Sequence, residues 1–151
     1  MKVVRVIDKE LADKCDEMLT SLIMDERKYD ANIKKDFVVN GWYFTTLGDK
    51  NKVTFAAVEE EKAVGFIHGF IKDEAGVTVN DTVLMLDAVF VNTENRGRGI
   101  AKALIDELKK WGKAVNAGYI DLTVLNDNYK AIRLYEKLGF VPVKTYMRKK
   151  I

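Results

Sequence analysis

The stretch NRGRGIAKAL, which runs from Asn95 to Leu104, places two glycines and two arginines directly before an apolar pattern. From Arg98 onward, large apolar residues recur every three or four positions as far as Val115, and Gly118 then closes the pattern. This spacing predicts an amphipathic helix that begins beside the two glycines. These glycines form either an ordinary surface turn or a site that holds an anion at the start of the helix.

A glycine-rich turn that leads into a helix is suited to phosphate. The first amides of a helix have no acceptor within it, and glycine lets an anion approach them closely. Arg96, Arg98 and Lys102 add positive charge nearby. The spacing is not that of the P-loop or of the dinucleotide fingerprint, since the Lys-Ser/Thr ending and the third glycine are missing. From these residues alone, a surface turn and a diphosphate cradle both remain open.

The rest of the chain predicts a mixed α/β (α+β) fold. The segment VLMLDAVFV (Val83–Val91) is almost continuously apolar, as in a central strand covered on both faces, and Asp87 is its one interruption. The other predicted elements, in chain order, are a strand at Val3–Ile7, a helix at Lys9–Met24, a hairpin of VTFAAVEE and KAVGFIHGFIK turning at Glu60–Lys62, a strand YIDLTVL, a helix from Ala131 to Leu138 stopped by Gly139, and a last strand FVPVKTYMRKKI (Phe140–Ile151).

Length and composition indicate one globular domain over residues 1–151. The 25 basic and 23 acidic residues nearly cancel to +2, so no nucleic-acid footprint is expected, and no run of apolar residues is long enough for a membrane span. A lone cysteine, Cys15, excludes an internal disulfide and suits a reducing cytoplasm. Its helical spacing predicts a buried thiol. With one histidine, His68, for which we expect a structural or surface role, no Cys/His metal site can form.

Two motifs in the C-terminal half resemble the signatures of the GNAT superfamily of N-acetyltransferases. RGRGIA (Arg96–Ala101) is similar to the family's Arg/Gln-x-x-Gly-x-Gly/Ala between its fourth strand and third helix. NYKAIRLYEKLGF (Asn128–Phe140) is similar to a second family stretch, Asn-x-x-Ala followed by Tyr-Glu-Lys-Leu-Gly-Phe. The motifs stand in the family's order, and the close resemblance covers Val83 to Phe140.

The resemblance implies a mixed, mostly antiparallel sheet with helices on both faces, and acetyl-CoA as co-substrate. The amides of Gly97 to Lys102 would bind its pyrophosphate, and the backbone of Val89 and Val91 would pair with the pantetheine arm as an extra strand would. Asn128 would hydrogen-bond the pantetheine, although capping the following helix explains it equally well. The implied cofactor-binding set is Val89, Val91, Arg96, Gly97, Arg98, Gly99, Ile100, Ala101, Lys102 and Asn128.

Acetyl transfer to an amine also needs a base, because a lysine-like amine is almost fully protonated at pH 7 and its deprotonation costs roughly 4 to 5 kcal/mol. Asp87 is the leading candidate. It stands two and four positions before Val89 and Val91, which predicts that its side chain shares their face, and burial would raise its pKa. The alternative is an exposed strand edge or an ion pair with a neighbouring lysine or arginine.

Other candidate residues have a functional and a structural interpretation each. By resemblance, Tyr135 donates its phenolic proton to the departing thiolate; otherwise it packs on the apolar side of its helix. Asp25 and Glu26 either are solvated charges or attract a cationic acceptor. The aromatic residues of the region that shapes the acceptor pocket in the family are core material by default: Tyr29, Trp42, Tyr43 and Phe44.

The sequence therefore predicts a cytoplasmic N-acetyltransferase that moves an acetyl group from acetyl-CoA to a primary amine by direct attack in a ternary complex. A small-molecule acceptor such as a polyamine, an aminoglycoside or an amino acid is expected, and no metal. Two alternatives are a protein lysine or N-terminal acetyltransferase, and an acyl-CoA-binding sensor without turnover. A homodimer stays open as the assembly.

Overall fold

The computed structural model describes residues 1–73, 76 and 82–151, and these form one five-stranded sheet with helices against it. The strands lie in the order of the sequence, β1-β2-β3-β4-β5. Their bounds are β1 Lys2–Arg5, β2 Lys52–Glu59, β3 Lys62–Asp73, β4 Thr82–Val91 and β5 Tyr119–Leu122. The helices are α1 Lys9–Glu26, α2 Trp42–Thr45, the 3-10 turn η1 Thr93–Asn95, α3 Ile100–Ala114 and α4 Tyr129–Lys137.

Strand pairing is antiparallel from β1 to β4 and parallel between β4 and β5, with α3 as the crossover. The predicted hairpin is confirmed. Glu59 pairs with Lys62, and the two residues between them, Glu60 and Glu61, both have positive φ (46° and 64°). Two left-handed residues match the twist of the strands that they join, so this short turn fixes the register of β2 against β3.

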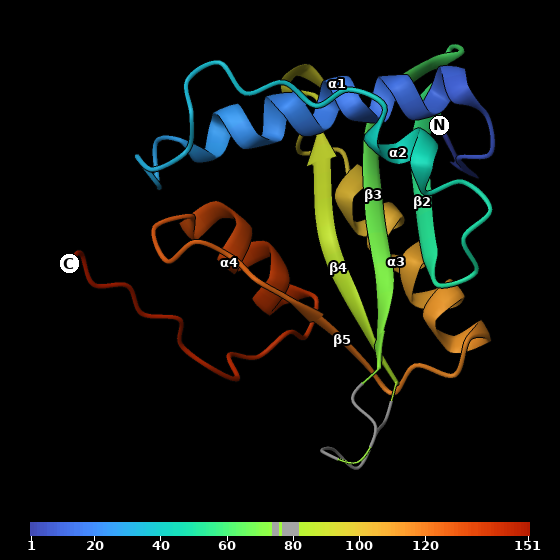
Figure 1. Ribbon diagram of the computed structural model, residues 1–151. Helices are drawn as coiled ribbons and strands as arrows, with labels where there is room; N and C mark the ends of the chain where they lie inside the picture. Colours follow the sequence, from blue (N-terminus) through green and yellow to red (C-terminus); the bar gives the residue numbers. More distant parts are fainter. Residues whose placement is uncertain (74–75, 77–81) are drawn as a thin grey trace.

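Helices cover both faces of the sheet, as expected (Figure 1). On one face, Ala12, Cys15 and Met18 of α1 pack with Tyr43 of α2 against Phe66 of β3. On the other face, the apolar side of α3 packs against β2, β3 and β4 through Ile100, Leu104, Ile105 and Leu108. The sheet is thus the middle layer of three, which explains why β4 is apolar on both faces.

Strand β4 has neighbours on both sides over only half of its length. Val83 to Leu86 pair with Tyr119 to Leu122 of β5, whereas from Asp87 to Val91 only β3 lies alongside. At this point the register shifts, because His68 pairs with Ala88 and Gly69 pairs with Leu86. Asp87 is therefore the extra residue of a β-bulge, where β4 and β5 begin to separate.

The bulge overturns one prediction about Asp87. Leu86 and Val91 both pack on the α3 face although they are five positions apart, while Ala88 and Phe90 face α1. The alternation of side chains is thus displaced by one residue at Asp87, which lies on the face opposite to Val89 and Val91. The spacing of two and four predicted a shared face, since sequence alternation assumes an unbroken strand.

The predicted strand Phe140–Ile151 is wrong. The structure gives these residues no strand partner, and residues 141–151 are all exposed. Alternating apolar residues make a segment able to form a strand, but a strand exists only where another strand offers it hydrogen bonds.

Smaller differences lie at the ends of the elements and in the segment before Lys52. Helix α1 continues to Glu26, so Asp25 and Glu26 lie in its last turn and not on a bridge, and α2 was not predicted. Cys15 and His68 are buried, as a core thiol and a structural histidine. No helix within the described residues has the length and apolarity that a membrane span needs.

Candidate functional site

The loop between β4 and α3 has the backbone that the glycine pattern predicts. Gly97 (φ 76°) and Gly99 (φ 79°) are both left-handed, a conformation that costs other residues about 1 kcal/mol or more. No atom lies within 4 Å of the position that a Cβ would occupy on either glycine. Both glycines are therefore required by backbone conformation and not by crowding, and the space beside them is open.

Three amides face this space at the start of α3. Gly99 is the N-cap, and the first helical hydrogen bond runs from the Ala103 N–H to the Gly99 carbonyl at 3.0 Å. Among the residues that the structure describes, the N–H groups of Ile100, Ala101 and Lys102 find no hydrogen-bond acceptor. Unpaired donors and the positive end of the helix dipole make this terminus a binding surface for an anion.

All three neighbouring cations are paired with acids of the same chain, Arg96 with Asp25 at the end of α1. Arg98 donates two hydrogen bonds to the Glu59 carboxylate, each 2.9 Å long, which connects the loop to the end of β2. Lys102 pairs with Asp106 one turn further along α3. An anion at this loop would therefore meet main-chain amides first, and Arg98 or Lys102 would reach it only by leaving these partners.

Arg96 is directed away from the glycines and holds the end of β4. Its Nε donates to the Val91 carbonyl at 2.8 Å, and its Nη2 donates to Asp25 at the end of α1 at 3.2 Å. Its guanidinium also lies over the Phe90 ring, 5.3 Å from the centroid. The structure thus gives Arg96 a positioning role, between the glycine loop, β4 and α1.

The open half of β4 directs main-chain groups toward the space left by β5. The Asn92 N–H donates to Val64 on the β3 side at 2.9 Å, whereas the Val91 carbonyl points the other way, toward Arg96. Because the direction alternates along a strand, the N–H and C=O of Val89 also face the open side. The two residues predicted to pair with an extended ligand are the two that present their backbone outward.

Asp87 lies exposed at the lower end of this open half. It faces the α1 side, where its negative charge helps to raise the pKa of the buried Tyr43 phenol after the larger effect of burial. Although the side chain reaches solvent, the protein around it removes part of its hydration, which raises the pKa of Asp87 above its ordinary value. The exposed position at an unpaired strand edge is one of the two structural alternatives that the sequence left open for Asp87. The other, an ion pair, is not observed, because within the described residues no lysine or arginine pairs with it.

Tyr135 on α4 and Glu26 at the end of α1 lie in electrostatic range of each other, although they are far apart in the sequence. Tyr135 on α4 is half-buried, with its ring edge against Phe140 at a centroid distance of 5.6 Å. Burial raises the pKa of Tyr135 to about 12, and the charge of Glu26 adds to this shift. Burial, and then the charge of Asp30, also raises the pKa of Glu26. The Tyr135 phenol therefore keeps its proton at neutral pH.

Asn128 caps α4, as one of its two interpretations predicted. Its side-chain oxygen accepts a hydrogen bond from the Ala131 N–H at 3.3 Å. Satisfying this amide anchors the start of the helix that carries Tyr135. The predicted contact of Asn128 with pantetheine stays a prediction.

Sequence reasoning missed Asp16, which fixes α2 against α1. Its carboxylate is 3% exposed and accepts hydrogen bonds from the N–H groups of Trp42 (3.0 Å) and Tyr43 (3.1 Å). The available signal was an acid next to Cys15 on the apolar side of the helix, where a charge needs partners. As a result Tyr43 is fully buried, whereas Trp42 and Phe44 are 56% and 47% exposed and are not core residues.

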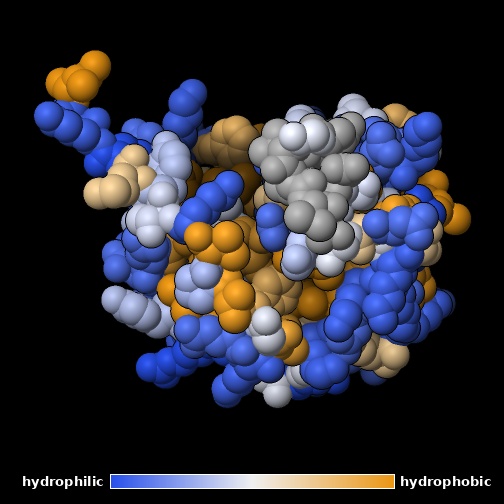
Figure 2. Space-filling model, turned by 90° about the horizontal axis from the view of Figure 1, so that it is seen from below, coloured by the Kyte–Doolittle hydropathy of each residue, from blue (hydrophilic) through white to orange (hydrophobic). Residues whose placement is uncertain are grey.

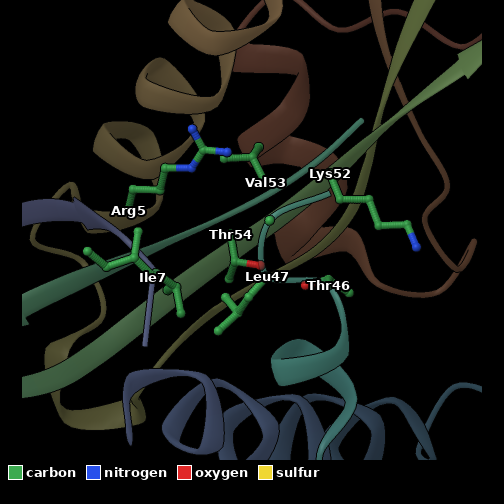
Figure 3. Close-up of a pocket in the computed structure, with 9 residues that line it drawn as sticks. Arg5, Ile7, Thr46, Leu47, Lys52, Val53 and Thr54 are labelled. Atoms are coloured by element: carbon green, nitrogen blue, oxygen red, sulfur yellow. The ribbon is translucent and has the colours of Figure 1, made fainter. Parts of the chain in front are cut away.

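A cavity of about 330 Å³ lies elsewhere, between the ends of β1 and β2 and the turn after α2 (Figure 3). The hydroxyl of Thr46 donates to the Tyr43 carbonyl at 2.8 Å, and that of Thr54 is bonded to His68 at 2.8 Å. Lys52 points away from Thr54 and Thr46. Since its buried hydroxyls are already used inside the fold, we place the functional site at the glycine loop. No group of metal ligands occurs among the described residues.

Comparisons with known proteins identify the family of the chain. The model of the acetyltransferase (GNAT) family matches residues 16–140, and the chain belongs to this family. The L-2,4-diaminobutyric acid acetyltransferase of Halalkalibacterium halodurans is 26% identical over 117 residues, which are 78% of this chain and 56% of that protein. The chain spans about half the length, or less, of the curated relatives that it matches first.

Solved structures share the fold over the whole chain. A tetramutant of the BH1408 protein from Bacillus halodurans superposes with a TM-score of 0.87 at 18% identity, covering 100% of both chains. The aminoglycoside N-acetyltransferase AAC(6')-Iy, solved in complex with CoA, superposes with a TM-score of 0.77 at 18% identity, covering 99% of this chain and 100% of that one. These likenesses establish the fold.

Proposed function

We propose that this chain is an acetyl-CoA-dependent N-acetyltransferase whose acceptor is a primary amine of a small molecule. The observation that carries the proposal is the row of free amides at the start of α3. They lie beside the half of β4 that pairs with β3 on one side but has no strand on its other side. The proposal treats residues 1–151 as a single catalytic domain. We also propose that it acts in the cytoplasm, because its one cysteine is a buried thiol.

The residues present fit acetyl-CoA as co-substrate. Its pyrophosphate matches the amides of Ile100 to Lys102, which Gly97 and Gly99 leave open to an approaching anion. An extended pantetheine matches the outward N–H and C=O groups of Val89 and Val91, as an added strand would. The CoA complex of AAC(6')-Iy, which has the same fold, supports this arrangement. When bound, acetyl-CoA supplies the thioester carbonyl that the amine attacks.

In the proposed reaction, Asp87 takes a proton from the acceptor ammonium, directly or through water. The neutral amine then forms the N–C bond, the C–S bond breaks, and the nitrogen gives up its second proton to water to become the amide. A raised pKa makes Asp87 a better base than an ordinary aspartate. Its position at the bulge, where β4 and β5 begin to separate, supports this role, since this is where a ligand between the two strands would end.

Tyr135 is proposed to give its phenolic proton to the departing thiolate. Its pKa of about 12 keeps it protonated over the working range of the enzyme. Its place on α4, in electrostatic range of Glu26, supports a role near the reacting atoms. Packing against Phe140 holds the ring in one orientation, which a proton donor needs.

Two observations favour a small cationic acceptor. At and just after the end of α1, Asp25 and Asp30 are paired with Arg96 and Arg148, whereas Glu26 forms no ion pair within the described part of the chain, so its carboxylate is open to a cation. The relatives named above are a diaminobutyrate acetyltransferase and an aminoglycoside acetyltransferase, whose names specify small amines. A protein lysine or N-terminus is the alternative acceptor, and an acyl-CoA sensor without turnover is the alternative activity.

The test of the activity is release of free thiol from acetyl-CoA with a panel of polyamines, diamino acids, aminoglycosides and lysine peptides. We expect release that depends on acetyl-CoA and on at least one small amine, together with the mass of the acetylated product. Release with peptides alone would replace the proposed acceptor by a protein, and binding of acetyl-CoA without release for any amine would favour the sensor.

Gly99→Ala tests the phosphate cradle. An added methyl group would occupy the space of the phosphate and keep it from the amides, so we expect the Kd of acetyl-CoA to rise about 10- to 100-fold, the loss of one charge-assisted hydrogen bond. Gly48→Ala is the matched control, because Gly48 has the same left-handed φ (80°) and equally open surroundings. Calorimetry would contradict the cradle if a folded Gly99→Ala protein bound acetyl-CoA as tightly as the control.

Asp87→Asn tests the base through its pH dependence. We expect kcat/KM at neutral pH to fall by about 10²- to 10⁴-fold. The deficit should shrink above the pKa of the acceptor, where the amine is already neutral. In the unchanged enzyme, the rate should fall as pH decreases through the raised pKa of Asp87, because the protonated carboxyl cannot accept a proton. Asp121→Asn, an exposed acid of β5, is the control, and equal pH profiles for the two variants would remove Asp87 as the base.

Tyr135→Phe tests the acid. The variant keeps the ring and its packing, so we expect kcat to fall by about 10²-fold while the KM for acetyl-CoA stays nearly constant. Tyr129→Phe, on the same helix but 62% exposed, should leave both constants unchanged. Steady-state kinetics with equal kcat for all three proteins would show that another group, or water, protonates the thiolate.

A further inference from the structure

The phenol of Tyr43 is buried and has no hydrogen-bond partner. Tyr43 is 0% exposed, and its hydroxyl is the buried side-chain group that finds no partner in the part of the chain that the structure describes. Hydrophilic side chains otherwise belong in water, and Figure 2 shows them around much of the rim of the lower face. A buried hydroxyl without a partner lowers stability, and phenylalanine would fill the same space. The hydroxyl therefore indicates a role other than packing.

The neighbours of the Tyr43 ring place it beside the bulge of β4. The ring packs edge-on against Phe66, with centroids 5.3 Å apart, and lies tilted against His68 at 4.9 Å. His68 is the residue of β3 that pairs with Ala88, the position next to Asp87. Figure 1 shows α2, which carries Tyr43, on the same side of the sheet as α1, and this is the side that Asp87 faces. Tyr43 and Asp87 thus share a face at the same level of the sheet.

Asp87 is an acceptor that matches this donor. Over the described ranges, its carboxylate takes part in no ion pair or hydrogen bond. Loss of hydration raises the pKa of Asp87, and no neighbouring donor lowers it. Among the charges that act on the Tyr43 phenol, that of Asp87 has the largest effect; with burial, it raises the pKa of the phenol, which stays protonated. A donor without an acceptor therefore lies near an acceptor without a donor.

The other polar groups around the phenol are already bonded or keep one charge state. On β3, Nδ1 of His68 is bonded to a hydroxyl of β2, and burial, followed by the charge of Lys52, lowers the pKa of His68 to about 4. On α1, Asp16 accepts hydrogen bonds from two main-chain N–H groups at the start of α2. Burial raises the pKa of Cys15 to about 12, so it stays a thiol. This leaves Asp87 as the acceptor for the phenol.

We propose that Tyr43 is a positioning residue for Asp87: its phenol donates a hydrogen bond to the Asp87 carboxylate, directly or through one water, and so fixes the direction in which the carboxylate takes a proton. A bulged strand edge gives a side chain few contacts that orient it, and a donor from α2 supplies one. The inference rests on the proposed role of Asp87 in acetyl transfer, but the hydrogen bond itself can be measured without a substrate.

The test of the hydrogen bond is the pKa of Asp87, measured by NMR on its carboxyl carbon in the substrate-free chain and assigned with Asp87→Asn. We expect Tyr43→Phe, which removes only the hydroxyl, to raise this pKa by about one pH unit, because the ionised carboxylate loses a donor. Thr46→Val is the matched control. It removes a buried hydroxyl that already donates to the Tyr43 carbonyl, and it should leave the pKa of Asp87 unchanged. An unchanged pKa in Tyr43→Phe, or the same rise in both variants, would overturn the proposal.

A measurement on the unchanged chain applies even if Tyr43→Phe does not fold. The Cζ atom of Tyr43 carries the phenol oxygen, so its chemical shift should change as Asp87 ionises. The change should disappear in Asp87→Asn, which alters an exposed side chain. A Tyr43 Cζ signal that stays constant through the ionisation of Asp87, or that changes equally in Asp87→Asn, would also contradict the hydrogen bond.

Kinetics separate the positioning role from the proposed function. With an amine that the chain acetylates, we expect Tyr43→Phe to lower kcat about 10-fold and to leave the KM for acetyl-CoA unchanged. The acidic limb of the kcat/KM profile should move to higher pH by about one unit, because Asp87 then takes up its proton at higher pH. An unmoved limb would reject the positioning role. No turnover with any amine, together with the expected rise in the pKa of Asp87, would reject acetyl transfer and confirm the hydrogen bond.

Discussion

The separation of β4 from β5 halfway along β4 is the constraint on which the rest of the molecule depends. Below Leu86 the two strands share a parallel ladder, and above it the bulge at Asp87 ends the pairing. A strand with a free edge in the middle of a sheet leaves main-chain donors and acceptors unsatisfied. The proposed use of this edge is to bind an extended ligand, with the start of α3 at one end and Asp87 at the other.

The basic residues around the glycine loop hold it in position through hydrogen bonds more than they add net positive charge to it. Arg96 connects it to β4 and α1, and Arg98 connects it to Glu59 at the end of β2. Exposed ion pairs of this kind contribute little to stability, typically below about 1 kcal/mol, but they restrict the conformations of a short loop. A protein with a net charge of only +2 can in this way present a concentrated set of donors, because the amides of α3 supply the partial charge.

The distribution of titratable groups limits the chemistry. His68, the only histidine, is buried against Tyr43, with ring centroids 4.9 Å apart, and burial lowers its pKa to about 4. At neutral pH the imidazole of His68 is therefore uncharged, and its burial keeps it from contact with a substrate. The groups proposed for proton transfer are instead Asp87, whose pKa is raised, and the phenol of Tyr135.

Local patterns determined most of the helices and strands, though not α2 or the segment after Phe140, together with the hairpin turn at Glu60 and the left-handed glycines at the start of α3, because each depends on residues a few positions apart. The family could also be identified from the sequence, since each of its two motifs is one uninterrupted stretch of residues. Tertiary structure decided what depends on distant partners. The face of Asp87 follows from a bulge against His68, the orientation of Arg96 from Asp25, and the burial of Tyr43 from Asp16. The segment after Phe140 has the alternation of a strand but no neighbour in its own chain, because hydrogen bonding to another strand is a property of the assembled sheet.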